Sequence, residues 1–263
     1  MRKILLTNDD GIGSKGLRAL EEAVKGLGKI YVVAPKGLQS STSRALTKRK
    51  FLEVEEMENY DGIERYAIDG TPATCVLIAI EKVLKEKPDL IISGINLGEN
   101  LGTTTYTTSG TIGAALEAAT TYGIPAIAAS VIIPIEHHEI HEDYPVDLTI
   151  AKNYLRKISK YILESPNNGR EYDVLNINFP LSSEDKGFRI TAPSKNKFYH
   201  PDLIEKDGKY KISHSIKVED EEENSDVKAV FDGKVSITPL SFISNNGISI
   251  EKIEKIFNDV IKW

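Results

Sequence analysis

The chain has one cysteine and no long apolar segment. Cys75 stands alone among 263 residues, which excludes an internal disulfide framework and a zinc site built from several cysteines. No apolar stretch approaches the roughly 18 residues that a transmembrane helix needs, and the apolar run at residues 4–7 is too short for the core of a signal peptide. From these absences we expect a cytoplasmic protein with no membrane partner.

Basic residues are also fewer than acidic residues. The chain has 33 Lys and Arg residues against 39 Asp and Glu residues, which gives a formal net charge of -6. An acidic balance argues against general binding to a phosphate backbone, so we expect no stable nucleic-acid partner. It leaves open a small anionic substrate held by a local metal site.

Two adjacent carboxylates follow the first predicted strand. Residues 3–7 form a short apolar run, Asp9 and Asp10 come almost directly after it, and residues 16–24 have helical apolar spacing before a second apolar run at 30–34. This order predicts parallel strands in an α/β sheet, whose ligands bind outside the carboxyl ends of the strands. Two neighbouring carboxylates repel each other there, and a bound Mg²⁺, Mn²⁺ or Ca²⁺ would relieve the repulsion. A solvated turn is the alternative interpretation.

The same loop imitates a dinucleotide-binding motif. Residues 11–16 match G-x-G-x-x-G between a strand and a helix. That motif also requires an acidic residue at the end of the second strand, where this chain has Pro35 and Lys36. Asp9 and Asp10 would also crowd a pyrophosphate, so we interpret the glycines as turn residues around the carboxylates.

Further polar segments are expected on the same edge of the sheet. The loop at residues 36–44 is rich in hydroxyl groups, which can coordinate a hard cation, and Arg44 can meet a phosphate; a flexible surface loop is the alternative. A strand predicted for residues 88–94 leads to Asn96 and Asn100, each of which could equally be a turn residue.

A Ser-Gly-Thr turn, residues 109–111, precedes the helix predicted for 112–119. Such a turn offers an anion free N–H groups, hydroxyl donors and the positive end of the helix dipole. Ordinary N-capping by Ser109 or Thr111 would look the same in the sequence.

The rest of the chain divides by composition near residue 185. The first part, residues 1–184, is predicted to be an α/β core, and residues 185–263 a β-rich hairpin and C-terminal helix extension that mediates oligomer contacts. Glu136–Glu142 holds three histidines and could bind a transition metal, but we favour a solvated loop, because the segment is charged and flanked by proline. We interpret the acidic run at 219–223 as a solvated loop too. The remaining predictions are strands within 51–68 and at 126–130, 172–180, 188–191, 210–212, 227–230 and 235–238, helices at 73–85 (capped by Thr71), 146–165 and 249–262, and a threonine-rich loop at 103–108.

Taken together, these segments resemble the SurE (survival protein E) family of metal-dependent nucleotidases. The resemblance lies in the order and spacing of short motifs at residues 4–11, 33–35 with Ser40, 70–73, 93–96 with Gly98 and Asn100, 109–111, 123–128, 176–178 and 236–240. It implies a Rossmann-like core with a mostly parallel sheet flanked by helices. It also implies a homodimer or tetramer with exchanged C-terminal segments.

The resemblance further implies which residues form the site. One set of residues would bind a divalent metal ion, Mg²⁺ or Mn²⁺: Asp9, Asp10, Ser40 and Asn96. A second set would bind the phosphate of the substrate: Asn100, Ser109, Gly110 and Thr111.

We therefore expect a 5′-nucleotidase that hydrolyses nucleoside monophosphates. In this hypothesis a water activated by the metal attacks phosphorus, with Asp9 and Asp10 as the catalytic residues. An aspartyl-phosphate phosphatase is a near rival, although its D-x-D motif differs from the adjacent carboxylates here. A dinucleotide-binding oxidoreductase and a non-catalytic nucleotide-binding protein remain as alternatives from other classes.

Overall fold

The computed structural model describes residues 1–137, 144–165, 172–218 and 222–242. Its strands are β1 (Lys3–Thr7), β2 (Lys29–Pro35), β3 (Val54–Glu56), β4 (Glu64–Ile68), β5 (Leu90–Leu97), β6 (Ala126–Val131), β7 (Val174–Phe179), β8 (Phe188–Ile190), β9 (Tyr199–Lys206), β10 (Lys209–Ile216) and β11 (Val235–Leu240). Nine of them form one sheet in the order β3-β4-β2-β1-β5-β6-β7-β11-β8.

The centre of this sheet is parallel. Ile4 of β1 lies beside Ile30 of β2 on one side and Leu90 of β5 on the other. Strands β5, β6 and β7 continue in parallel. Within this sheet β3 pairs antiparallel with β4 and β11 pairs antiparallel with β7, whereas β8 pairs parallel with β11. This arrangement confirms the predicted Rossmann-like, mostly parallel α/β sheet.

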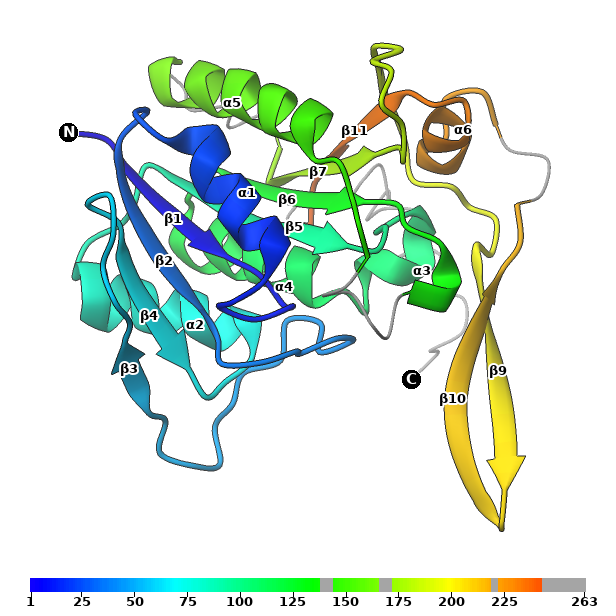
Figure 1. The fold of residues 1–263 in the computed structure, drawn as a ribbon, viewed down its shortest axis with the longest axis horizontal. Coiled ribbons are helices and arrows are strands. Elements are labelled where there is room, and N and C mark those ends of the chain that lie inside the picture. Colours follow the sequence, from blue (N-terminus) through cyan, green and yellow to red (C-terminus); the bar gives the residue numbers. More distant parts are fainter. Residues whose placement is uncertain (138–143, 166–171, 219–221, 243–263) are drawn as a thin grey trace, which may run out of the picture.

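Helices cover both faces of the sheet (Figure 1). Helices α1 (Lys15–Val24) and α5 (Thr149–Glu164) pack with Ile4 and Leu6 on one face. Helices α2 (Pro72–Ile78) and α4 (Gly110–Leu116) pack with Leu5 on the other. Both continue as π-helical segments, Ala79–Leu84 and Glu117–Thr121, and a short 3-10 helix spans Ile135–His137. Because successive strand residues point to opposite faces, a strand buried on both sides is apolar throughout.

Side-chain caps define where several helices begin. Thr71 accepts a hydrogen bond from the Thr74 N–H, and Pro72 is the first helical residue of α2, as predicted. Ser14 caps α1 in the same way by accepting from the Leu17 N–H. The predicted helix and strand boundaries in this part of the chain are confirmed to within a few residues.

Two sequence predictions were wrong. The threonine-rich segment is not only loop, because Gly102–Tyr106 forms the short helix α3. Residues 227–230 are not a strand but lie in helix α6 (Asp226–Phe231). The Ser225 hydroxyl caps α6 by accepting from the Lys228 N–H, and Asp226 binds the N–H of Gly102 at the start of α3. For residues 227–230 these contacts outweigh the strand preference of valine, which is weak and depends on context. For the threonine-rich segment, the bond from Gly102 to Asp226 fixes the start of a helix where a loop was predicted.

The chain beyond residue 184 contributes strands to the main sheet and to a separate hairpin. Strands β8 and β11 extend the main sheet beyond β7, whereas β9 and β10 form a separate antiparallel hairpin that projects from the body of the molecule (Figure 1). The helix predicted for 249–262 lies outside the described residues, as do 138–142 of the histidine-rich segment and 219–221 of the acidic run. Within the described ranges, no helix is long and apolar enough to cross a membrane.

Candidate functional site

The Asp9 carboxylate is a buried acidic group at the carboxyl end of β1. Its side chain accepts two hydrogen bonds from Thr111, at 2.6 Å from the hydroxyl to Oδ1 and at 3.1 Å from the backbone N–H to Oδ2. Burial raises the pKa of the Asp9 carboxyl, and the bonds from Thr111 counteract part of that rise. Both donors are neutral, so neither compensates a negative charge on Asp9.

A glycine at the start of α4 makes this contact possible. A Cβ atom on Gly110 would lie 2.8 Å from Asp9 Oδ2 and 3.0 Å from Thr42 Oγ1. Only a residue without a side chain lets the first turn of the helix approach the carboxylate so closely. The Ser109 hydroxyl accepts from the Ile112 N–H at 3.1 Å and so fixes where the helix begins.

The loop that carries Asp9 and Asp10 is held from several sides. Asn8 is fully buried, and its amide group donates to the Gly11 carbonyl at 3.0 Å and to the Ser14 hydroxyl at 2.7 Å. The Gln39 N–H donates to the Asp9 carbonyl at 2.7 Å, which attaches the hydroxyl-rich loop to the same place.

Behind this loop lies a buried ion pair that sequence reasoning missed. Arg65 of β4 pairs with Glu21 of α1, and both side chains are about 5% exposed. Arg65 also donates to the Ile12 carbonyl at 3.2 Å and to the Tyr60 hydroxyl at 2.7 Å. The pair therefore braces the end of the Asp9 loop against the sheet. No local motif predicts this pair, because Arg65 and Glu21 are 44 positions apart in the sequence.

The four predicted metal ligands lie in one neighbourhood. Asp9, Ser40 and Asn96 line the same cavity. Asp10 is half-buried, and its Oδ2 lies 3.4 Å from the N–H of Leu97, the residue after Asn96. Asn96 donates its amide N–H to the Gly98 carbonyl at 2.5 Å, which leaves its amide oxygen for a ligand role. Carboxylate, amide and hydroxyl oxygens are the donors that hard divalent cations prefer.

This donor set fits Mg²⁺ or Mn²⁺ better than metals such as Zn²⁺ or Cu²⁺, which prefer nitrogen and sulfur ligands. Within the described ranges, no three His, Cys, Asp or Glu side chains gather in a way that would hold a metal ion. A cation beside Asp9 and Asp10 would need neutral oxygen ligands as well, and Ser40 and Asn96 carry such oxygens at the same cavity.

The predicted phosphate residues separate into two groups. Ser109 and Asn100 line the cavity, whereas Thr111 is fully buried against Asp9. Asn100 is fixed by its neighbours: its N–H donates to Asn178 at 2.8 Å, its side chain donates to Ser130 at 2.7 Å, and its carbonyl accepts from Asn176 at 2.9 Å. Arg44 does not line this cavity but binds the buried Glu117 at 2.7 Å.

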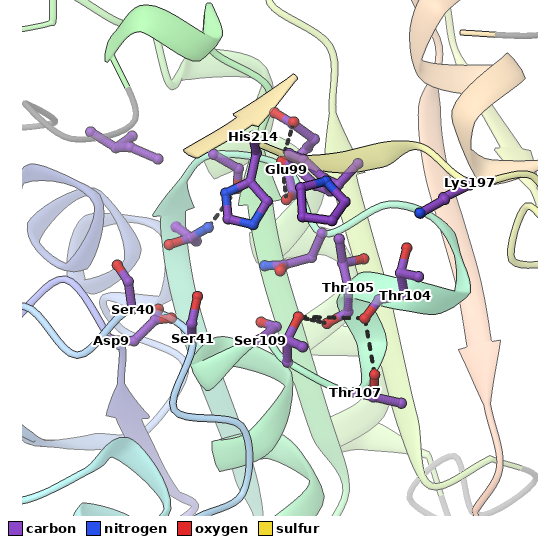
Figure 2. A pocket seen from close by; sticks show the side chains of 17 residues that line it. Asp9, Ser40, Ser41, Glu99, Thr104, Thr105, Thr107, Ser109, Lys197 and His214 are labelled. Carbon is purple, nitrogen blue, oxygen red and sulfur yellow. Dashed lines mark hydrogen bonds between the residues drawn. The ribbon is translucent and has the colours of Figure 1, made fainter. Parts of the chain in front are cut away.

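The cavity has a volume of about 500 Å³ and two differently built sides (Figure 2). We call Asp9, Asn96, Asn100 and Ser109 the pocket floor. The opposite side, which we call the pocket roof, consists of Tyr199, Pro201 and His214 from the hairpin β9–β10. Glu99, Lys197 and the threonines of the α3 region complete the lining. The roof residues and Glu99 were not predicted as site residues, since nothing local in the sequence brings them to Asp9.

Comparison with known proteins decides the family. The family model "Survival protein SurE" matches residues 4–200. The chain is 40% identical to the "5′-nucleotidase SurE" of Methanothrix thermoacetophila, over 96% of this chain and 97% of that protein. It is 37% identical to the protein of the same name from Archaeoglobus fulgidus, over 99% of each chain.

The chain belongs to the SurE family.

Its fold is also similar to a solved member of that family. The crystal structure of the SurE protein from Aquifex aeolicus superposes with a TM-score of 0.75 at 32% identity, covering 97% of this chain and 99% of that one. SurE membership confirms the resemblance that the sequence motifs predicted.

Membership in the SurE family also disfavours the dinucleotide alternative, and the structure gives a local reason. Lys36, at the end of β2, forms ion pairs with Glu53 at 2.6 Å and Glu55 at 3.0 Å. A cationic group in ion pairs cannot accept the hydrogen bonds of ribose hydroxyls, which is the task of the acidic residue in that motif.

Proposed function

We propose that this chain is a metal-dependent 5′-nucleotidase, which hydrolyses nucleoside monophosphates to nucleoside and phosphate. One observation supports this proposal above the others: a buried carboxylate, Asp9, faces a cavity whose floor also carries neutral oxygen ligands and hydrogen-bond donors. The SurE relatives that share up to 40% identity over nearly the whole chain carry the name 5′-nucleotidase.

Asp9, Asp10, Ser40 and Asn96 are the residues that we propose hold one divalent cation, Mg²⁺ or Mn²⁺. When bound, such a cation neutralises phosphate charge and makes water more acidic. Asp9 is clamped by Thr111 and is therefore suited to a fixed ligand position. Asp10 is half-buried and is the residue we assign to orient the attacking water.

The phosphate lies on the pocket floor in this proposal. The Ser109 hydroxyl and the Asn100 side chain line the cavity beside Asp9, where each can donate to an equatorial phosphate oxygen. Because both groups are locked by neighbouring hydrogen bonds, they require no reorganisation when charge develops on those oxygens. Gly110 and Thr111 act beneath them by fixing Asp9 against the helix start.

The experiment is phosphate release from a panel of nucleoside monophosphates, with Mg²⁺, Mn²⁺, Ca²⁺ or EDTA. We expect release that depends on the cation and falls by about a thousandfold in Asp9→Asn and Asp10→Asn, a loss typical of removing a preorganised polar group from an active site. Asp61→Asn is the matched control, since Asp61 is exposed and pairs only at the surface with Lys25. No release with any cation from folded protein would refute the proposal, and nucleotide binding without turnover would favour a binding protein.

We also propose that residues 185–263 mediate a homo-oligomer. The support is the projecting hairpin, whose apolar side chains Leu203, Ile204, Tyr210 and Ile212 are each at least half exposed. Sedimentation of the intact chain and of Leu203→Glu tests this directly, because a charge at a self-contact should lower the assembly mass. The cytoplasmic location expected from the sequence stays a prediction.

A further inference from the structure

The pocket roof presents one continuous face of the hairpin β9–β10 to the cavity. His214 lies directly opposite Pro201 in the hairpin register, and Tyr199 lies opposite Ile216. Side chains at alternate positions of a strand share a face, so Tyr199, Pro201 and His214 point the same way. All three line the cavity, and Figure 2 shows His214 across it from Asp9 and Ser109.

The two aromatic side chains of the roof are arranged as neighbours. The ring centroids of Tyr199 and His214 are 6.0 Å apart with an interplanar angle of 78°. Phe198 supports Tyr199 from behind, with centroids 4.9 Å apart. The Tyr199 hydroxyl donates to the Glu99 carboxylate, which ties the roof to the segment that follows β5. The roof is therefore an anchored aromatic surface.

The cavity is larger than a phosphate bound at the pocket floor would fill. A phosphate group fills only a small part of about 500 Å³, a volume in the ordinary range for sites that enclose whole small molecules. With the phosphate at Asp9 and Ser109, the remainder of a nucleotide extends toward the roof. Aromatic side chains that face the planar part of a nucleotide stabilise it by stacking.

We propose that Tyr199 and His214, flanked by Pro201, form the nucleoside subsite, in which the base of the substrate stacks against the roof while its phosphate lies on the floor. This inference rests on the proposed function and adds to it the residues that recognise the non-reacting part of the substrate. The roof makes a base-bearing phosphomonoester a better substrate than the corresponding sugar phosphate. The Tyr199 and His214 side chains are specificity-determining, and neither touches the reacting phosphorus.

The test compares AMP with ribose 5-phosphate, which keeps the sugar and phosphate but lacks the base. In the unaltered protein we expect kcat/KM for AMP to exceed that for ribose 5-phosphate by at least about tenfold, the effect of one stacked base. His214→Ala should raise KM for AMP about tenfold, with kcat and the KM for ribose 5-phosphate changed by less than about twofold. His214→Phe, which keeps an aromatic face, should restore the KM for AMP.

An exposed aromatic residue outside the hairpin provides the matched control. Tyr161 lies on α5 and does not line the cavity, and 69% of it is exposed. Tyr161→Ala should therefore leave kcat/KM for both substrates unchanged. Saturation-transfer NMR with adenosine, without any metal, gives a binding readout independent of turnover, and its signal should weaken in His214→Ala and persist in Tyr161→Ala.

The outcomes separate this inference from the function on which it rests. If the unaltered protein releases phosphate from neither substrate, the proposed function fails. If it hydrolyses AMP and ribose 5-phosphate equally well, or if His214→Ala raises KM for both substrates alike, the function stands and the nucleoside subsite is refuted.

Discussion

The floor and the roof of the pocket are held in place by different means. Asp9, Asn100 and Ser109 are all buried and are bonded to residues of α4, β6 and β7. His214 is exposed on a two-stranded hairpin, and the roof is tied to the rest of the pocket through Tyr199 and Glu99. Reaction chemistry needs groups held to fractions of an ångström, whereas stacking tolerates variation in position. The floor thus suits catalysis, and the roof suits recognition of a substrate that must enter and leave.

The largest effect is expected from breaking the support of the floor. Arg65→Met would leave Glu21 as a buried carboxylate without its cation, at a cost of about 3–5 kcal/mol in the free energy of unfolding. The double variant Glu21→Leu, Arg65→Met should lose clearly less, because no unpaired charge remains. Chemical denaturation of the three proteins measures this. A single-variant cost below about 1 kcal/mol would show that the pair does not brace the Asp9 loop.

A smaller but more local effect is expected at the start of α4. Gly110→Ala places a methyl group against Asp9 and should cost about 1–3 kcal/mol of stability, as overpacking does. Phosphate release should fall as well, because Asp9 is displaced. Gly13→Ala is the control, since a Cβ there meets nothing within 4 Å. Equal behaviour of the two variants would contradict the close approach of helix and carboxylate.

Asp226, which links α3 to the segment before the hairpin, should make the stability of the protein depend on pH. Asp226 accepts hydrogen bonds from Gly102 and Tyr106 of α3 and from Ser194, which precedes the hairpin, at 2.9, 2.6 and 2.8 Å. Burial raises the pKa of the Asp226 carboxyl above its ordinary value of 3.8, and hydrogen bonds led by that from Tyr106 offset only part of the rise.

The sign follows from proton binding. Above the ordinary carboxyl pKa the unfolded chain has lost this proton while the folded chain keeps it, so the free energy of unfolding falls as pH rises through the raised value. The slope is at most about 1.4 kcal/mol per pH unit. Asp226→Asn has no proton to lose, so the stability of the unaltered protein relative to this variant should decrease over that range in denaturation at a series of pH values. If the stability of the unaltered protein relative to Asp226→Asn instead increased with pH, the raised pKa of Asp226 would be contradicted.

The smallest effect is expected at the hairpin tip, far from the floor. Lys206 and Lys209 lie directly opposite each other across the hairpin, and like charges in that position destabilise it. Lys209→Glu should increase the hydrogen-exchange protection of the hairpin amides by roughly twofold and lose that gain at high salt. Phosphate release should not change. A change in release would mean that floor and roof are coupled more tightly than their contacts indicate.

Local patterns predicted most of the sheet but not the contacts that build the pocket. The apolar runs at β1, β2 and β5 and the Thr71-Pro72 helix start were sufficient because each signal lies within a few residues. Residues 103–106 and 227–230 were predicted wrongly because a contact between distant segments, that of Asp226 with Gly102, holds both helices. The pocket roof was not predicted for the same reason: Tyr199 and Glu99, whose contact ties it to the rest of the pocket, are 100 positions apart.

The sequence by itself determined the α/β order of the chain, the adjacent carboxylates after the first strand and the Ser-Gly-Thr turn at a helix start. Only the tertiary structure decided what these pieces do for one another. Thr111 holds Asp9 from 102 positions away, and Gly110 leaves the space for that contact. Propensity and periodicity act over one or two turns of chain, whereas hydrogen bonds and close packing act between whatever segments the fold brings together.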